Sequence, residues 1–269
     1  MENQRINHLY FNKQRLMAKF NILLLTILVL NSIGAYACSC VNRGLTENFQ
    51  QSEFVAKAKI IKITPDPKNE MYHDAELELI AVYKGERLKR IKITSELNSS
   101  CAFLPAVNST WIIFAAKWQG VLSFGFCSGG LNFSRTFDPV KYPNGGLHYF
   151  KRMALQQQVL EYLSSNKLLN PNPLGLDTFN HELLTIKGFK NKDEIAVFEV
   201  DLTTDLSISA IRNVKKFENE ALTKAVFDSM KTDVILVKPR NKTTPKPTQM
   251  LMFCYFFEKD TGESYVSLF

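Results

Sequence analysis

Cysteine placement is the feature that most constrains what this chain can fold into. Cys38, Cys40, Cys101 and Cys127 lie within about 90 residues, and Cys254 stands far downstream. A bond between Cys38 and Cys40 would strain a very small loop, which leaves two arrangements of long-loop bonds, crossed or nested. A zinc site competes with this interpretation, but C-x-C is tighter than the usual ligand spacing. We therefore expect two structural disulfides.

The segment before Cys38 has the pattern of a secretory signal peptide. Three basic residues come first: Lys13, Arg15 and Lys19. The short apolar run "FNILLLTILVL" follows, and Ala35-Tyr36-Ala37 places small residues at the −3 and −1 positions of a cleavage site. The run is shorter than the ~20 residues that span a bilayer. The sequence predicts a signal peptide at 1–37, with translation beginning at Met1 or Met17.

An exported chain explains the cysteine usage, because disulfides persist in oxidising compartments. We expect a secreted, periplasmic or cell-envelope protein. A lipid anchor at Cys38 is the less favoured alternative, because Tyr36 is bulky where lipoprotein signals carry a small residue. No other segment predicts a transmembrane span in the mature chain.

The charge of the chain argues against nucleic acid as a partner. The formal net charge is +7, and residues 1–37 contribute +3 of it. The remainder is mildly basic and has no stripe of Arg and Lys interleaved with aromatic residues. We therefore predict no nucleic-acid binding.

Five strand-like segments fill residues 54 to 127. They are "FVAKAKIIKI", "AELELIAVYKGE", "RIKITSE", "TWIIFAAKW" and "GVLSFGFC". Several alternate apolar and polar residues, and Gln119-Gly120 between the last two predicts a hairpin turn. Short strands at this spacing are typical of a small barrel or sandwich.

The pattern changes after Pro139. Residues 147–169 have helical apolar spacing, at Phe150, Met153, Ala154, Val159, Leu160 and Leu163. The "NPNP" at 170–173 then stops the helix, which we expect to pack on one neighbour as a connecting element.

The last part predicts a small α+β domain of order β-β-α-β. Its segments are "EIAVFEVDL", "DLSISAIRNV", the amphipathic "ENEALTKAVFDSMK" and "QMLMFCYFFE", which contains Cys254. We expect Cys254 to be a buried, inert thiol. The predicted organisation is a signal peptide (1–37), an all-β barrel domain (38–140), a connecting helix and linker (141–175) and the α+β domain (176–269).

Residues 38–134 resemble the netrin-like inhibitory domain of the tissue inhibitors of metalloproteinases. The resemblance rests on "CSCV", "NFQQSEFVAKAKII", "VYKG", "SSCAF" and "GFCSGG", in that order. It implies an OB-like barrel and the pairings Cys38–Cys101 and Cys40–Cys127. It also implies a zinc endopeptidase as partner, whose active-site zinc would be chelated by the α-amine and carbonyl oxygen of mature Cys38.

The same resemblance implies an inhibitory ridge beside that cysteine. Its residues are Ser39, Cys40 and Val41, with Ser99, Ser100 and Ala102 near Cys101 as a second edge. The chain departs from the family at Gln50, where the family has a third cysteine, and at Asn42 and Arg43, where prolines are common. The alternative function is a non-inhibitory binding or scaffold module of the envelope or extracellular space.

Residues 194–258 resemble the carboxy-terminal domain of TonB and its relatives. The resemblance rests on "VFEVDLTTDLSISAIRNV", "ENEALTKAVFDSM" and "MLMFCYFFE". Asp205-Leu206-Ser207-Ile208 stands where that family often has Asp-Gly-x-Ile, so the glycine is missing. The resemblance implies a protein partner for this domain, which the sequence does not identify.

Enzyme motifs are absent from the sequence. "HELLT" at His181 lacks the second histidine of a zinc-hydrolase helix, and no P-loop, dinucleotide fingerprint or nucleophile motif occurs. We predict that the protein is not an enzyme, needs no cofactor and holds no metal in its free form.

Overall fold

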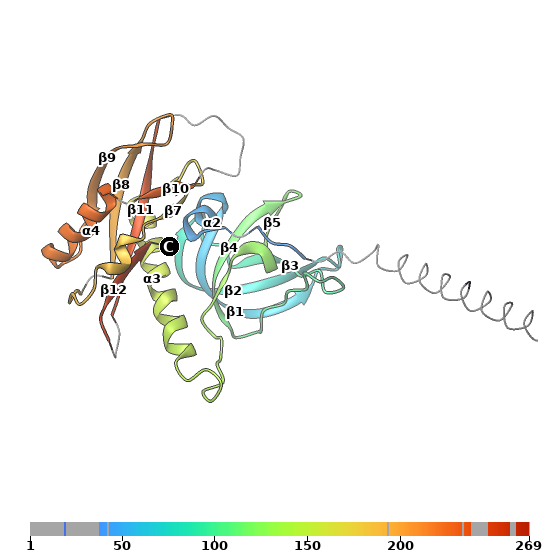
Figure 1. The fold of residues 1–269 in the computed structure, drawn as a ribbon. Helices are drawn as coiled ribbons and strands as arrows, with labels where there is room; N and C mark the ends of the chain where they lie inside the picture. Colours follow the sequence, from blue (N-terminus) through green and yellow to red (C-terminus); the bar gives the residue numbers. More distant parts are fainter. Residues whose placement is uncertain are drawn as a thin grey trace, which may run out of the picture. The chain divides into compact units, whose positions relative to one another are not determined.

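The computed structural model of the chain describes Lys19 and residues 38–41, 43–192, 194–232, 234–237, 247–258 and 262–268. The chain divides into two compact units, Met1–Ser39 and Cys40–Phe269. Apart from Lys19, the predicted signal peptide lies outside the described residues. The elements below all belong to the second unit (Figure 1).

The first half of this unit is a closed five-stranded barrel. Its strands are β1 (Phe54–Pro65), β2 (Tyr72–Lys84), β3 (Arg90–Thr94), β4 (Thr110–Trp118) and β5 (Val121–Gly125). They pair in the order β1-β2-β3-β5-β4, and β4 closes the barrel on β1. Only β3 and β5 run parallel. The predicted barrel and its five strands are confirmed.

Three short elements border the barrel. Helix α2 (Leu45–Gln51) precedes β1, and the 3₁₀ turn η1 (Phe126–Ser128) and strand β6 (Leu131–Asn132) follow β5. Strand β6 pairs with the start of β4.

Local sequence explains the two tightest turns. Gln119 and Gly120 have φ angles of 49° and 81°, the left-handed pair that a two-residue hairpin between β4 and β5 requires. Gly85 ends β2 at φ +84°, and a Cβ there would lie 2.4 Å from the Glu53 carbonyl oxygen. Only glycine fits that position without moving the backbone before β1.

Helix α3 (Gly145–Ser165) connects the barrel to the second half. Its buried side chains are Met153, Leu155, Val159, Leu160 and Leu163. Two predicted contact positions differ, because Phe150 and Ala154 are exposed. The helix is confirmed, with boundaries a few residues earlier than predicted.

The second half is a four-stranded antiparallel sheet in the order β12-β11-β8-β9. Its elements are β8 (Ile195–Leu202), β9 (Ile208–Lys215), helix α4 (Glu220–Thr232), β11 (Thr248–Phe257) and β12 (Tyr265–Leu268). The predicted β-β-α-β order holds, and β12 adds an edge strand. Strands β7 (Asp177–Phe179) and β10 (Ile235–Val237) form a separate pair, and η2 (Glu182–Thr185) lies between β7 and β8.

Among the described residues, three clusters of buried side chains form the core. One contains alternate residues of all five barrel strands, such as Ala56, Ile93 and Phe124. Another lies between the four-stranded sheet and α4, and includes Phe198 and Val226. Cys254 belongs to this second cluster and is a free, fully buried thiol, as the sequence predicted.

The third cluster joins the two halves. Leu160 and Leu163 of α3 share it with Phe114 of the barrel and with Val197 and Tyr255 of the sheet. Helix α3 therefore packs on two neighbours, not one as expected. Because both sheets belong to one compact unit, a division into two independent domains stays a prediction. Within the described residues, no helix is both long and apolar enough to cross a bilayer.

Candidate functional site

A disulfide fixes the segment that precedes α2. Cys40 and Cys127 are bonded, with Cα atoms 5.1 Å apart, so the chain before α2 is tied to η1 at the end of β5. This is one of the two bonds that the first resemblance implies. Since each sulfur is bonded to the other, neither Cys40 nor Cys127 offers a thiolate to a metal. The Cys38–Cys101 pairing stays a prediction.

The predicted ridge falls on both units. Cys38 is half-buried and Ser39 exposed, and both belong to the first unit. Val41, in the second unit, is 57% exposed. The other predicted edge, Ser99, Ser100 and Ala102, is exposed on the loop after β3. The ridge as a whole therefore stays a prediction.

That loop is held at its base by a buried polar group. The Ser95 hydroxyl donates to the Met71 carbonyl oxygen at 3.0 Å, and Ser95 N–H donates to the same oxygen at 2.8 Å. Since its proton goes to Met71, the Ser95 hydroxyl accepts from His73 Nδ1 at 2.8 Å. Both side chains are buried, so this Ser–His pair anchors the loop and does not present a nucleophile.

Two turns then shape the exposed part of the loop. Ser99 N–H donates to the Glu96 carbonyl oxygen at 2.9 Å, and Cys101 N–H donates to the Ser99 hydroxyl at 3.0 Å. Phe103 N–H returns to the Ser95 carbonyl oxygen at 2.9 Å, and its ring packs edge-on against Phe124. The loop is thus ordered by its own hydrogen bonds.

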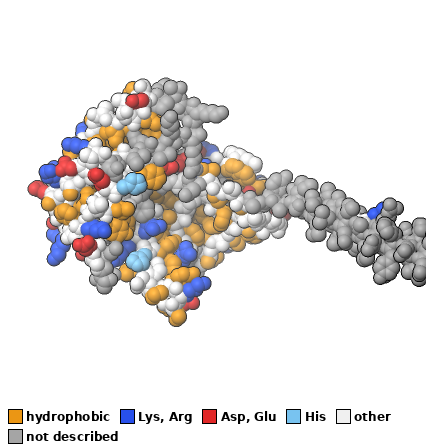
Figure 2. Space-filling view, viewed as in Figure 1, with side chains coloured by type: hydrophobic (Ala, Val, Ile, Leu, Met, Phe, Trp, Pro, Cys, Tyr) orange, Lys and Arg blue, Asp and Glu red, His pale blue; other side chains and the backbone are white. Residues whose placement is uncertain are grey.

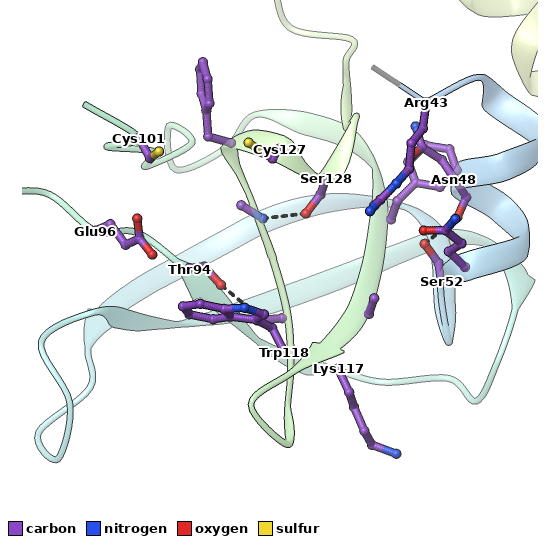
Figure 3. A pocket seen from close by; sticks show the side chains of 16 residues that line it. Arg43, Asn48, Ser52, Thr94, Glu96, Cys101, Lys117, Trp118, Cys127 and Ser128 are labelled. Atoms are coloured by element: carbon purple, nitrogen blue, oxygen red, sulfur yellow. Dashed lines mark hydrogen bonds between the residues drawn. The ribbon is translucent and has the colours of Figure 1, made fainter. Parts of the chain in front are cut away.

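A pocket of about 540 Å³ opens between this loop, η1, α2 and the β4–β5 hairpin. Figure 3 shows Glu96 and Cys101 on one side of Cys127 and Ser128, with Arg43 and Asn48 on the other. Of the residues lining this pocket, sequence reasoning named Cys101 and Cys127 as site residues and Arg43 only as a departure from the family.

Charge and apolar surface meet in the pocket. Arg43 and Lys117 supply positive charge and Glu96 supplies negative charge. Lys117 also forms an ion pair with Glu53 at 2.9 Å. Trp118 and Phe126 line the pocket and are 44% and 54% exposed. Exposed aromatic side chains around a concavity mark a surface that can bury area against a partner.

Lys84 positions the helix that forms one wall of the pocket. Its ammonium group donates to the carbonyl oxygens of Phe49 and Gln50 at 2.8 and 2.9 Å, at the carboxy-terminal end of α2. Burial lowers the pKa of Lys84, and the charge of Glu53 opposes that shift. This lysine belongs to the "VYKG" stretch, but nothing in the sequence alone indicates its contact with α2.

The turn before β9 is tight although it lacks the glycine that the second resemblance implies. Leu206 adopts φ +67°, the left-handed region that glycine favours. The Asp205 carboxylate accepts from Ser207 N–H at 3.2 Å and from the Ser207 hydroxyl at 2.9 Å, which closes the turn. The Thr203 hydroxyl also donates to the Asp205 carboxylate. This hydrogen bond makes the largest contribution to lowering the pKa of Asp205, and the two from Ser207 lower it further.

Comparison with known proteins does not add a family assignment. No protein-family model matches the chain, and no curated protein sequence matches it significantly.

Proposed function

We propose that the disulfide-clamped end of the barrel is a protein-binding surface, and that its partner is a zinc endopeptidase. One observation carries the proposal. The Cys40–Cys127 bond fixes the segment that directly follows Cys38 at the end of the barrel where the 540 Å³ pocket opens. The strand order of the barrel also supports an OB-like, netrin-like fold, whose loops commonly bind other molecules.

On this proposal, removal of the signal peptide creates a new α-amine at Cys38. A catalytic zinc keeps one coordination position open, and the amine and carbonyl oxygen of Cys38 together would fill it in place of water. The amine must be deprotonated to bind metal, and its ordinary pKa is about 7.7–8.0. Ser39 would enter the specificity pocket of the protease.

Pre-organisation favours tight binding at such a surface. The covalent clamp at Cys40 and the hydrogen-bonded loop at Ser99 are ordered before a partner arrives, so little conformational entropy is lost on docking. The exposed side chains of Val41 and Phe126 then supply apolar area at low ordering cost.

The second candidate is a binding module that does not inhibit. The exposed aromatic residues of the pocket favour it, because they need neither a free amine nor a zinc ion in the partner. For the sheet of the second half, strand β9 lies at an edge, and among the described residues it pairs only with β8. We propose that this edge takes the unidentified protein partner, by adding a strand.

The test of the zinc mechanism moves the amine without changing the fold. One added Ala before Cys38 shifts the amine by about 3.3–3.8 Å, whereas zinc coordination tolerates only about 0.2 Å. We expect this extension, and acetylation of the amine, to abolish inhibition of a panel of zinc endopeptidases. Ser39→Gly should instead shift preference among the panel. Circular dichroism and thiol counts confirm that each variant is folded.

A matched variant separates the two candidates. Phe126→Ser should weaken binding to a partner under either one, because the ring is exposed at the pocket. The Ala extension should weaken binding only if the amine contacts zinc. If the unmodified mature protein inhibits none of the panel at micromolar concentration, the inhibitor proposal is wrong and the binding module stands.

A further inference from the structure

We propose that the outer end of α3 is a binding surface for anionic phospholipid bilayers. We call residues 135–152 the α3 tip; they comprise the loop after β6 and the first two turns of α3. Four large apolar side chains there are exposed: Val140 by 91%, Tyr142 by 51%, Leu147 by 44% and Phe150 by 37%.

A built turn holds the most exposed of these side chains outward. The Asp138 carboxylate accepts from Val140 N–H at 2.8 Å and from Lys141 N–H at 3.1 Å. The Asp138 carbonyl oxygen accepts from Tyr142 N–H at 2.8 Å. The turn is therefore formed before any contact, and Val140 and Tyr142 project from it without an ordering cost to the backbone.

Aromatic packing fixes this turn on the helix. The Phe137 ring lies 5.2 Å from the Tyr149 ring and 6.4 Å from the Phe150 ring. A Cβ on Gly145 would lie 2.9 Å from the Tyr142 Cβ and 3.0 Å from the Phe137 ring, so a side chain there would push the turn away from the helix. The Tyr149 hydroxyl donates to the Asn132 carbonyl oxygen at 3.0 Å, which ties the tip to β6.

The net positive charge of the α3 tip favours an anionic partner. The tip contains Arg135, Lys141, Lys151 and Arg152 against one acidic residue, Asp138, whose carboxylate accepts the two N–H bonds of the turn. Arg135 lies over the Phe137 and Tyr149 rings, at 5.0 and 5.3 Å, and Lys141 lies over Tyr142 at 5.4 Å.

A convex surface of this composition fits a membrane interface. Tyr and Phe insert at the level of the headgroups, while adjacent Lys and Arg attract anionic lipid. Figure 2 shows apolar side chains with basic ones beside them at the lower end, where Figure 1 draws the loop before α3. Lying on a bilayer in this way needs no membrane-spanning helix.

Vesicle flotation tests the proposal with the mature chain. At 0.1 M salt we expect the protein to float with vesicles of phosphatidylcholine and 30% phosphatidylserine, and not with phosphatidylcholine alone. Val140→Asp should lower the partition coefficient about tenfold, and Lys141→Gln about fivefold. Leu184→Asp is the matched control, because Leu184 is 52% exposed on η2, and it should leave vesicle binding unchanged.

Tyr142→Trp gives a second readout at the tip itself. Its emission should shift to the blue on anionic vesicles, whereas the unmodified chain, with Trp111 and Trp118 in the barrel, should show no shift. Failure of the unmodified chain to float with anionic vesicles overturns the proposal, as does an equal loss in Leu184→Asp. Retention on heparin without vesicle binding would identify an acidic polymer as the partner and also overturn it. None of these outcomes depends on the zinc mechanism.

Discussion

The barrel and the four-stranded sheet are both β structures, but they bury their strands differently. Strand β3 of the barrel alternates buried and partly exposed residues. Strand β8 of the sheet buries all of its residues except Glu199 and Asp201. At β3 the barrel wall has one buried face, whereas the four-stranded sheet lies between α4 on one face and α3 on the other. The difference shows that an unbroken apolar strand marks a middle layer.

The two regions also differ in how their ends are secured. Closure of the barrel leaves no free edge among its five strands, and a disulfide ties its ends together. The sheet keeps β9 and β12 as edges, and its one cysteine is a buried free thiol. The barrel should thus depend on covalent restraint, and the sheet on packing alone.

Of the changes considered, removing the Cys40–Cys127 bond should lower the free energy of unfolding the most. The bonded residues are 87 positions apart, so the entropic model predicts a loss of about 4–5 kcal/mol in Cys40→Ser/Cys127→Ser. Urea unfolding followed by tryptophan fluorescence measures the loss. Cys254→Ala, which leaves the barrel unchanged, should cost far less. Residual sensitivity of the double variant to reductant would report the predicted Cys38–Cys101 bond, and its absence would contradict that pairing.

Truncating a side chain in the core that the barrel and the sheet share should give the next largest loss of stability. Leu160 is fully buried between the barrel and the sheet, so Leu160→Ala should lower the free energy of unfolding by about 2–5 kcal/mol. Leu147→Ala, at an exposed position of the same helix, should cost less than about 0.5 kcal/mol.

Two probes report the halves separately in that experiment. Trp111 and Trp118 are the two tryptophans and both lie on β4, while Cys254 is the free thiol and lies in the sheet. Burial raises the pKa of Cys254 and shields it from alkylating reagents until the sheet opens. Coincident transitions by fluorescence and by alkylation would show one cooperative unit. Separate transitions would support two independent domains.

Breaking a surface ion pair should have the smallest effect on stability, and the effect should be of the same kind in the barrel and in the sheet. Hydrogen bonds from Lys92 lower the pKa of Asp66 in the barrel, and those from Arg212 lower the pKa of Asp201 in the sheet. Because both folded pKa values are depressed, each contribution to stability is complete above the unfolded value of about 3.9. It is lost as the pH falls through the folded pKa.

Carboxyl titration by NMR checks this prediction. Lys92→Met should raise the pKa of Asp66 and leave that of Asp201 unchanged, and Arg212→Met should raise the pKa of Asp201 and leave that of Asp66 unchanged. An unchanged pKa in either variant would show that the ion pair does not persist in solution. Raising the salt concentration should reduce both shifts, because neither ion pair is fully buried.

Sequence patterns predicted the barrel strands well because each of them carries local information. Alternation along β3 and the Gln119-Gly120 turn are set by residues that are neighbours in the chain. Strands β7 and β10 were not predicted, because each has three residues and is too short for a period to show. Leu206 at a positive φ was also unexpected, since its turn is closed by the side chain of Asp205.

The candidate site was less predictable than the fold. The cysteines indicated its location, but the pocket is assembled from α2, β3, the β4–β5 hairpin and η1, which are distant in sequence. The contact between Lys84 and the end of α2 spans about 35 positions and has no local signature. Exposure of Phe126 likewise depends on tertiary structure, because an apolar residue after a strand is ordinarily expected to be buried.

Because α3 packs against both the barrel and the four-stranded sheet, thermal unfolding of this chain can be used to screen for ligands. A compound or protein that binds only the folded unit raises its stability by about 2.7 kcal/mol at a hundred times its dissociation constant, wherever it binds. If the shared core makes unfolding a single event, one melting curve reads out ligands for the pocket and for the β9 edge alike. An unbiased thermal-shift search over envelope extracts and purified proteases would then find a partner without knowing in advance which end it contacts.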